Sequence, residues 1–411
     1  MENRNGEKKT KRSKLGPGFL VAAAFIGPGT VTTATLAGAQ HGYALMWVVV
    51  IATLATIVLQ EMVGRFSLAT KIDVASALVR LTAVKWLKWG FQILGFLAII
   101  VGCAAYETGN IIGGSLGLEI LTDRPRYVWV ILISGAAVVL LWQRSYKFIE
   151  KFLIALVVVM GISFFITVVI VKPDFSGIMK GFIPVIPPKS ILLVLALLGT
   201  TVVPYNLFLH SSTILKKWKG KQDMSLMRKD TYLSIGLGGV ITASIIVTAA
   251  VAFFLQEKGI KTPDIETPVI KTPADLAVQL TPLYGKLAKV FFGIGLFGAG
   301  LSSAITAPYA AAWTASGLFG WEKKEENWRF RVVFLVVILF GAVVSILDLE
   351  PLHMIVVAQV TNAVLLPVVA LFILYLLNKR EVGEYKNRLV QNILFVIVFI
   401  IIVLINLKNF M

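Results

Sequence analysis

The sequence is poor in the residues on which most metal proteins and disulfide-rich proteins depend. It contains one cysteine, Cys103, and three widely separated histidines, His41, His210 and His353. One cysteine excludes an intrachain disulfide framework and a multi-cysteine metal site, and the histidines are too scattered to predict a cluster. No Gly-rich phosphate loop ending in Lys-Ser/Thr is present, so nothing indicates an ATP-driven pump. We therefore expect no enzyme, no catalytic residues and no cofactor.

Charged residues are also scarce, and this decides the class of protein. Only 15% of the residues are charged and 57% are hydrophobic, whereas roughly a quarter are charged in a soluble protein. The apolar runs are long enough, or nearly so, to cross a hydrocarbon layer about 30 Å thick. We predict an all-α polytopic membrane protein, surrounded by the lipid bilayer, with eleven transmembrane helices. The predicted helices are 16–40, 43–66, 89–118, 126–142, 148–171, 190–214, 231–255, 283–315, 331–347, 352–377 and 389–407.

The net charge of +17 follows membrane topology and does not indicate a nucleic-acid partner. With eleven spans, most Lys and Arg residues fall in connections on one side of the membrane. Because basic residues gather on the cytoplasmic side, we expect a multi-pass plasma-membrane protein with its N-terminus inside the cell and its C-terminus outside. These basic connections are the N-terminal tail and the loops around 67–88, 143–151, 215–230, 318–331 and 378–388.

Two of the predicted helices are interrupted near their middle. The first contains Gly27–Gly29 with a central proline, and the sixth contains Gly199 and Pro204. Proline removes a backbone donor and clashes with the carbonyl four residues back, so both helices are predicted to be broken. Unwound backbone at membrane depth is tolerated only where it is buried in protein or lines a water-filled cavity. The breaks therefore predict a solute site, with the carbonyls of Ile26, Gly27, Val202 and Val203 as candidate ligands.

The positions of the breaks predict an internal repeat. They fall in the first and sixth helices, so each break leads a set of five. Because five is odd, the second set enters the membrane from the opposite side, which is the inverted repeat of many secondary transporters. We predict alternating access around the breaks. The predicted division is a cytoplasmic basic tail at 1–14, a first repeat at 15–172, an external loop at 173–189, a second repeat at 190–378, and an eleventh helix with the C-terminus at 379–411.

Several short motifs, spread over nearly the whole chain, resemble those of one known family. They read Gly16-Pro-Gly-Phe-Leu20, Gly27-Pro-Gly-Thr30, Ala39-Gln-His-Gly-Tyr43, Gly199-Thr-Thr-Val-Val-Pro-Tyr-Asn-Leu-Phe-Leu-His-Ser-Ser212, Phe292-Gly-Ile-Gly-Leu296, Ser302-Ser-Ala-Ile-Thr306 and Ala358-Gln-Val360. Together they resemble the NRAMP (natural resistance-associated macrophage protein) divalent-metal transporters. The resemblance implies a LeuT-like fold with a 5+5 inverted repeat, eleven helices and secondary transport.

The sequence departs from this family at the metal ligands. The family's first break reads Asp-Pro-Gly-Asn, and its sixth-helix motif reads Met-Pro-His. The corresponding positions here are Gly27 and Thr30, and Val203 and Tyr205. Gln359 matches a family glutamine. Together with it, these four positions form the expected substrate-binding set, and the sequence does not say which metal, if any, the set would bind. The oxygens of this set are neutral, and neutral oxygens suit hard cations or polar organic groups. We also expect Gly27 and Val203, which are smaller than the family's aspartate and methionine, to enlarge the cavity.

Part of the family's proton machinery has counterparts here. Glu107 and Asn110 replace the aspartate and glutamate of a family Ala-Thr-Asp-x-x-Glu pattern, and His210 matches a family histidine. An ionisable residue inside a span is functional by default, and imidazole titrates near neutral pH. The resemblance implies a proton pathway through these three residues, with satisfied packing roles as the alternative.

Three functions remain open at this stage. The first is secondary transport of an inorganic cation, with proton coupling undecided; the family resemblance favours it. The second is H⁺- or Na⁺-coupled transport of a small polar organic solute. The third is a sensor that kept the fold and lost transport. Two local predictions complete the analysis: an extended solvated loop over Lys258–Pro282, which contains repeated Thr-Pro, and an i,i+4 ion pair between Glu61 and Arg65.

Overall fold

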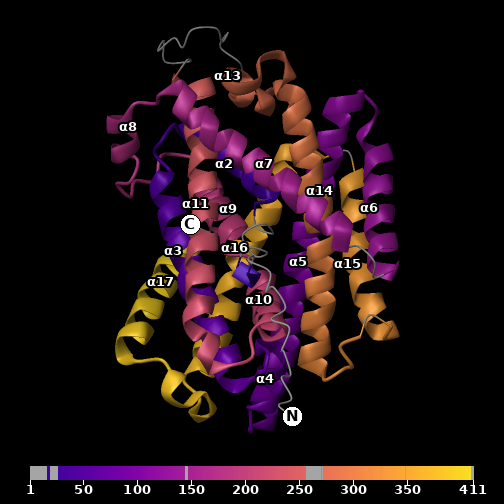
Figure 1. Ribbon diagram of the computed structural model, residues 1–411, viewed down its shortest axis with the longest axis vertical. Coiled ribbons are helices and arrows are strands. Elements are labelled where there is room, and N and C mark those ends of the chain that lie inside the picture. The colour runs from indigo at the N-terminus through magenta and orange to yellow at the C-terminus, as the bar shows by residue number, and fades with distance from the viewer. Residues whose placement is uncertain are drawn as a thin grey trace, which may run out of the picture.

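The computed structural model describes residues 16–18, 26–143, 147–255, 270, 272–324, 326–347 and 349–408, and within these ranges its regular elements are helices. The longer ones are α2 (Pro28–His41), α3 (Met46–Thr70), α5 (Lys85–Thr122), α6 (Arg126–Gln143), α7 (Lys147–Val171), α9 (Ile191–Thr201), α10 (Pro204–Lys217), α11 (Met224–Ala249), α14 (Ala288–Phe319), α15 (Trp328–Ile346), α16 (Pro351–Leu377) and α17 (Leu389–Lys408) (Figure 1). The shorter ones are α4 (Val74–Arg80), α8 (Phe175–Lys180), α13 (Thr281–Tyr284), η1 (Lys221–Asp223), η2 (Ala250–Phe254), η3 (Pro273–Leu280), η4 (Gly285–Leu287) and η5 (Arg380–Tyr385).

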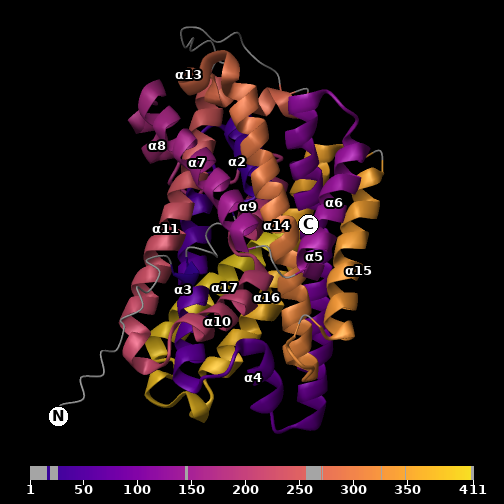
Figure 2. The same cartoon turned by 45° about the vertical axis from the view of Figure 1, so that its right-hand side comes forward.

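The predicted helical segments are confirmed where the structure describes them. Nine stretches of the described residues are long and apolar enough to cross a membrane, and α9 and α10 together form one of them. The remaining two predicted segments correspond to α2 and α17. Figures 1 and 2 place α5, α6, α14 and α15 together on one side of the molecule, and α3 and α11 on the other.

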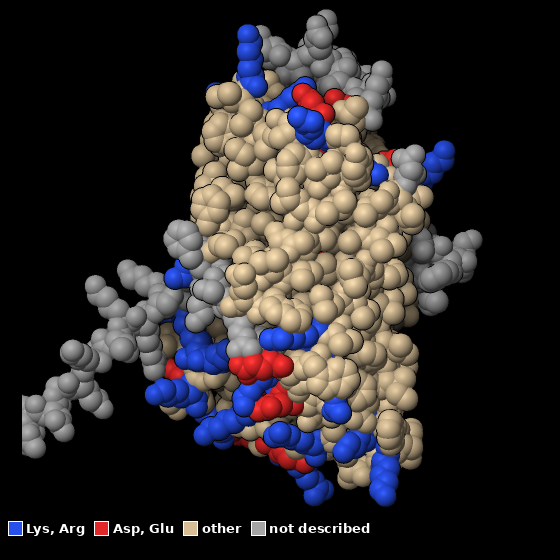
Figure 3. All heavy atoms as spheres, turned by 90° about the vertical axis from the view of Figure 1, so that its right-hand side faces the viewer, with Lys and Arg blue, Asp and Glu red and all other residues tan. Residues whose placement is uncertain are grey.

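The outer surface suits a hydrocarbon environment. Large apolar side chains such as Val169, Leu233 and Val343 are more than half exposed. On the face drawn in Figure 3, a broad band without charged residues separates two charged rims, and Lys and Arg gather on the rim at the α4 end. In water such a surface would drive aggregation, but in a bilayer it faces acyl chains. The chain is therefore a multi-pass membrane protein.

Both predicted helix breaks are present. α2 begins at Pro28, preceded by Gly27 in an extended conformation (φ −98°, ψ −175°). α9 ends at Thr201 and α10 begins at Pro204, with two non-helical residues between them. In each case proline is the first residue of the new helix, where its missing N–H and fixed φ cost nothing. The segment 19–25, which precedes the first break, lies outside the described residues.

Glycines let α5 and α14 approach each other closely. A Cβ added at Gly300 would collide with the backbone of Gly114, and one added at Gly117 would collide with the backbone of Gly293. Glycine, which has no Cβ atom, therefore occupies the positions where the backbones of α5 and α14 touch. This is the close helix packing that small residues allow in membranes, and it accounts for the Gly-rich stretches Gly113–Gly117 and Gly293–Gly300.

The first of these stretches also spells a pattern known from enzymes. Gly113–Gly117 reads G-x-S-x-G, which in hydrolases marks a nucleophile elbow between a strand and a helix. Here it lies inside α5, and the Ser115 hydroxyl donates a hydrogen bond to the carbonyl of Ile111 at 2.7 Å. The serine is fully buried. The surroundings are those of a packed helix and not of a catalytic turn.

The prediction of an extended loop up to Pro282 is wrong over its last part. Residues 256–269 and 271 lie outside the described residues, but Pro273–Leu280 forms a helical segment. A capping box begins it, in which the backbone N–H of Thr272 donates to the Asp275 carboxylate at 2.7 Å. Leu276 and Leu280 are buried, so packing adds to the capping.

We predict that Gly300→Ala destabilises the protein, because the added methyl group must push apart the backbones of α5 and α14. Overpacking of this kind costs about 1–3 kcal/mol, which would lower the midpoint of thermal unfolding in detergent. Gly135→Ala in α6 is the matched control, since nothing lies within 4 Å of its added Cβ. The control should unfold at or slightly above the parent temperature, because alanine is favoured over glycine in a helix. Equal midpoints for the two variants would contradict the packing argument.

Candidate substrate site at the helix breaks

The two helix breaks meet at one residue of α16, Gln359. A Cβ added at Gly29 in α2 would collide with its side-chain amide, and one added at Gly199 in α9 would collide with its backbone carbonyl. From α5, the Cβ position of Gly109 lies 3.5 Å from Gln359 Nε2. Glycine is thus required twice for α16 to fit against both broken helices. Gln359 is 1% exposed, so this crossing is buried within the protein.

Hydroxyl groups surround the breaks. The hydroxyls of Thr30 in α2 and Thr200 in α9 are hydrogen-bonded at 2.7 Å, and both residues are fully buried. Beside Gly27, an added Cβ would lie 3.1 Å from Ser303 Oγ of α14 and 3.5 Å from the hydroxyl of Tyr106 of α5. Four helices therefore bring neutral oxygen atoms to the same place.

Several amide groups near the breaks are buried and have no hydrogen-bond partner among the described residues. They include Gln359 Oε1 and both side-chain polar atoms of Asn206, which lies in the first turn of α10. The Gln359 Nε2 group donates only a long hydrogen bond, at 3.4 Å, to the carbonyl of Ile355. Buried polar groups are normally paired. These atoms are therefore available to a polar or charged solute.

The predicted substrate-binding residues lie on or beside the two broken helices and on α16, and two expectations about them need correction. Tyr205 lies edge to face against Tyr106, with ring centroids 5.5 Å apart, and Val203 directly precedes α10. The first correction concerns space: the flank of Gly27 is taken by Ser303 and Tyr106, so in this conformation the glycine does not enlarge the cavity.

The second correction concerns the backbone carbonyls. The carbonyl of Gly27 accepts a hydrogen bond from the N–H of Val31 at 3.2 Å, and that of Val203 accepts one from Asn206 at 3.1 Å. These bonds belong to the first turns of α2 and α10. The two carbonyls are therefore already engaged, and the side-chain oxygens are the better ligands.

The predicted proton-pathway residues divide into two places. Glu107 and Asn110 adjoin on α5, where the amide of Asn110 lies 3.4 Å from the Glu107 carboxylate, whose other oxygen has no partner. The side chain of Glu107 packs against Gly341 of α15. His210 of α10 is buried and instead lies 3.4 Å from the hydroxyl of Thr231 in α11. Within the described ranges no hydrogen bond connects the two places.

Thr200, Ser303 and Asn206 lie at or near the breaks but were not predicted as site residues. Small polar residues in otherwise apolar helices are the signal that could have identified them. Thr200 and Asn206 flank the sixth-helix break, and Ser303 lies in one of the family-like motifs. No group of three or more His, Cys, Asp and Glu side chains able to hold a metal occurs among the described residues.

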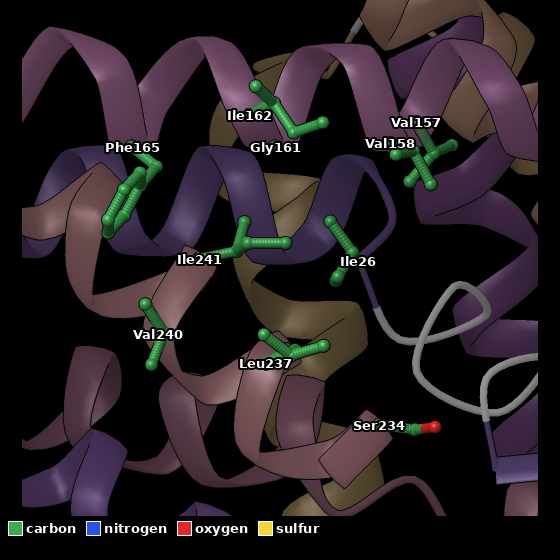
Figure 4. Close-up of a pocket in the computed structure, with 11 residues that line it drawn as sticks. Ile26, Val157, Val158, Gly161, Ile162, Phe165, Ser234, Leu237, Val240 and Ile241 are labelled. Atoms are coloured by element: carbon green, nitrogen blue, oxygen red, sulfur yellow. The ribbon is translucent and has the colours of Figure 1, made fainter.

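An apolar cavity of about 320 Å³ lies next to the first break, between α7 and α11. Figure 4 shows its lining, in which Ile26 faces Val157 and Val158 of α7 and Leu237 of α11. Ser234 is the polar side chain among the labelled residues. The cavity offers almost no ligand for an ion, so it is not part of the candidate site.

Comparisons with known proteins agree with this architecture. The Nramp family, described as natural resistance-associated macrophage protein-like, matches residues 18–411. A divalent metal cation transporter, MntH, from Brucella suis is 29% identical over 99% of this chain and 90% of its own length.

Solved structures show the same fold. A crystal structure of a mutant manganese transporter from Eremococcus coleocola superposes with a TM-score of 0.73 at 22% identity, covering 96% of this chain and 85% of that one. The structure of MhsT in complex with L-phenylalanine has a TM-score of 0.59 at 15% identity, covering 95% and 97%. These likenesses establish the LeuT-like fold with its inverted repeat and broken helices. Because the family match extends over almost the entire sequence, the chain belongs to the Nramp family.

Proposed function

We propose that the protein is a secondary-active transporter that carries an inorganic cation across the membrane by alternating access. The cation would bind at Gly27, Thr30, Val203, Tyr205 and Gln359. The observation that carries the proposal is the convergence of both helix breaks on Gln359, whose amide oxygen is buried and has no partner in the described part of the chain. A mid-membrane site between two broken helices is where secondary transporters of this kind bind their substrates.

The size and chemistry of the site favour an ion over an organic solute. The flank of Gly27 is filled by Ser303 and Tyr106, and the Thr30 and Thr200 hydroxyls lie against each other. An organic molecule would have to displace these side chains, whereas an ion needs only their oxygens. The relatives named as divalent metal cation transporters support the same substrate class.

The absence of a carboxylate among these residues limits which cation fits. Neutral oxygens suit hard cations, whereas Mn²⁺ and Fe²⁺ sites in proteins usually include a charged or nitrogen ligand. We infer that Mg²⁺ with part of its hydration shell, or a monovalent ion, binds better than Mn²⁺. Such ions lose less on entering a neutral site than a fully dehydrated divalent ion.

The membrane arrangement belongs to the same proposal. The repeats would comprise residues 15–172 and 190–378, joined by an external loop at 173–189 and followed by the eleventh helix at 379–411. The rim rich in Lys and Arg at the α4 end (Figure 3) supports a cytoplasmic location for that end. On this basis the basic tail at 1–14 lies inside the cell and the C-terminus outside, in the plasma membrane.

We predict that Gln359→Leu removes cation binding, because leucine keeps the volume and deletes the amide. The purified protein would be heated with Mg²⁺, Na⁺, K⁺, Mn²⁺ or amino acids. A cation at about one hundred times its dissociation constant should stabilise the parent by roughly 2.7 kcal/mol, and Gln359→Leu should lose this shift. Gln143→Leu, at the exposed end of α6, should keep it. A full shift in Gln359→Leu, or stabilisation of the parent by an amino acid alone, would refute the proposed site.

Glu107 is the proposed proton carrier, in company with Asn110, while His210 would act separately at the α10–α11 contact. We predict that Glu107→Gln leaves the cation-induced stabilisation in place but flattens the pH dependence of uptake into proteoliposomes. The amide has nearly the same shape and cannot release a proton. Glu119→Gln, near the end of the same helix, is the control and should retain the parent pH profile. The assignment fails if Glu107→Gln takes up cations with an unaltered pH profile.

A further inference from the structure

A second candidate site lies at the surface of the helix bundle. None of the residues that line it belongs to the helix breaks. α3, α11 and the start of α17, whose places are seen in Figure 1, line a cleft of about 360 Å³. It has a charged part and an apolar part. The residues that line it are Ile57, Val58, Glu61, Met62, Arg65, Arg228, Tyr232 and Gln391.

The charged part carries more positive than negative charge. The predicted ion pair is confirmed, because Arg65 Nε donates to Glu61 at 3.1 Å. The same carboxylate also accepts from Arg228 Nε of α11 at 2.9 Å. Two guanidinium groups therefore share one carboxylate, and the cluster has a net charge of +1.

The two arginines differ in how many of their hydrogen-bond donors have an acceptor. The Arg65 side chain is only 2% exposed, and its other nitrogens donate to the carbonyl of Tyr385 at 2.5 Å and to Asn387 Oδ1 at 2.8 Å. All three Arg65 nitrogens therefore have an acceptor, and two of them join α3 to the segment before α17. The Arg228 side chain is 39% exposed, and Glu61 is the acceptor it meets among the described residues. Arg228 lines the cleft, and of its five N–H donors only the one on Nε has an acceptor among the described residues.

The apolar part continues the lipid-facing surface of α3. Val50 and Leu54 are exposed by 41% and 55%, and Val58 and Glu61 follow at helical spacing on the same side. Leu233 and Leu237 of α11 are also exposed, by 69% and 58%. The cleft therefore opens to acyl chains on the bilayer side, whereas its charged part lies where α11 and α17 begin.

We propose that this cleft binds one anionic phospholipid of the leaflet at the α4 end of the molecule. Its phosphate would pair with Arg228, and an acyl chain would lie along Ile57, Val58 and Met62. Guanidinium is suited to phosphate, which it can bind through two parallel hydrogen bonds, and basic pockets between membrane helices are where anionic headgroups bind. The proposal does not depend on which solute is transported.

An anionic lipid would contact both the charged and the apolar part of the cleft, whereas each of the other ligands considered suits only one of these parts. Free phosphate would use Arg228 and leave the apolar groove without a role. A zwitterionic lipid would occupy the groove, but its own cationic group would lie near a cluster that is already positive. Only an anionic lipid supplies a net negative charge together with a hydrocarbon chain.

The test is thermal unfolding of the purified protein in mild detergent, with phosphatidylglycerol, phosphatidylcholine or inorganic phosphate added. We predict stabilisation by phosphatidylglycerol alone, and about tenfold weaker binding by Arg228→Gln. Native mass spectrometry should show one retained phosphatidylglycerol in the parent and its loss in the variant. Lys229→Gln is the matched control, because this exposed lysine is adjacent in sequence and does not line the cleft. It removes the same charge and should bind the lipid as the parent does.

A second variant tests the groove without altering any charge. Val58→Trp should fill the apolar part and weaken binding of phosphatidylglycerol, whereas Leu54→Trp, on the same face outside the cleft, should not. This pair also covers the case in which Arg228→Gln unfolds because Glu61 loses a partner. Equal lipid binding by each variant and its control would overturn the proposal. An equal response to phosphatidylcholine or to inorganic phosphate would overturn the assignment of an anionic lipid.

Discussion

The need to satisfy the backbone inside a hydrocarbon layer is the constraint on which this structure depends. Two helices are broken at membrane depth, and an exposed break would leave costly unpaired groups facing lipid. The chain avoids this by packing Gly29 of α2 and Gly199 of α9 directly on Gln359 of α16. Proline begins each new helix where no backbone donor is needed. The breaks persist because a third helix covers them, and the same cover creates the site.

This arrangement determines the chemistry available at the centre. The oxygens around the breaks come from hydroxyls and amides, and the Thr30–Thr200 pair joins the two broken helices. The buried carboxylate of Glu107 follows Tyr106 in sequence, yet it packs against α15 while the Tyr106 hydroxyl lies beside Gly27. None of the described residues that we assign to the site carries a carboxylate. Binding of a cation there must rest on neutral oxygens and retained water, which favours ions that are least costly to desolvate.

The sequence predicted the elements of the fold better than the contacts of the site. Hydropathy located the helical segments, because a span of lipid requires a long apolar run. Pro28 and Pro204 marked the breaks, because proline cannot continue a helix. Thr200 and Ser303 were missed, since an apolar run does not reveal which face of a helix meets another. The space beside Gly27 was misjudged for the same reason: a missing side chain says nothing of the neighbours that fill its place.

The cost of desolvating charge accounts both for the partners of the arginines and for the neutral ligands at the breaks. Arg65 can be buried because Glu61, Tyr385 and Asn387 satisfy it, and a buried charge without such partners would cost several kcal/mol. Arg228 adds a second positive charge to the same carboxylate, but it does so at the rim of the helix bundle. There an anionic headgroup can supply the missing charge from outside the protein. At the middle of the membrane no lipid headgroup is within reach. A permanent net charge of either sign there would therefore be uncompensated whenever the site is empty. Neutral ligands at the centre and surplus arginine at the edge therefore follow from the same cost of desolvation.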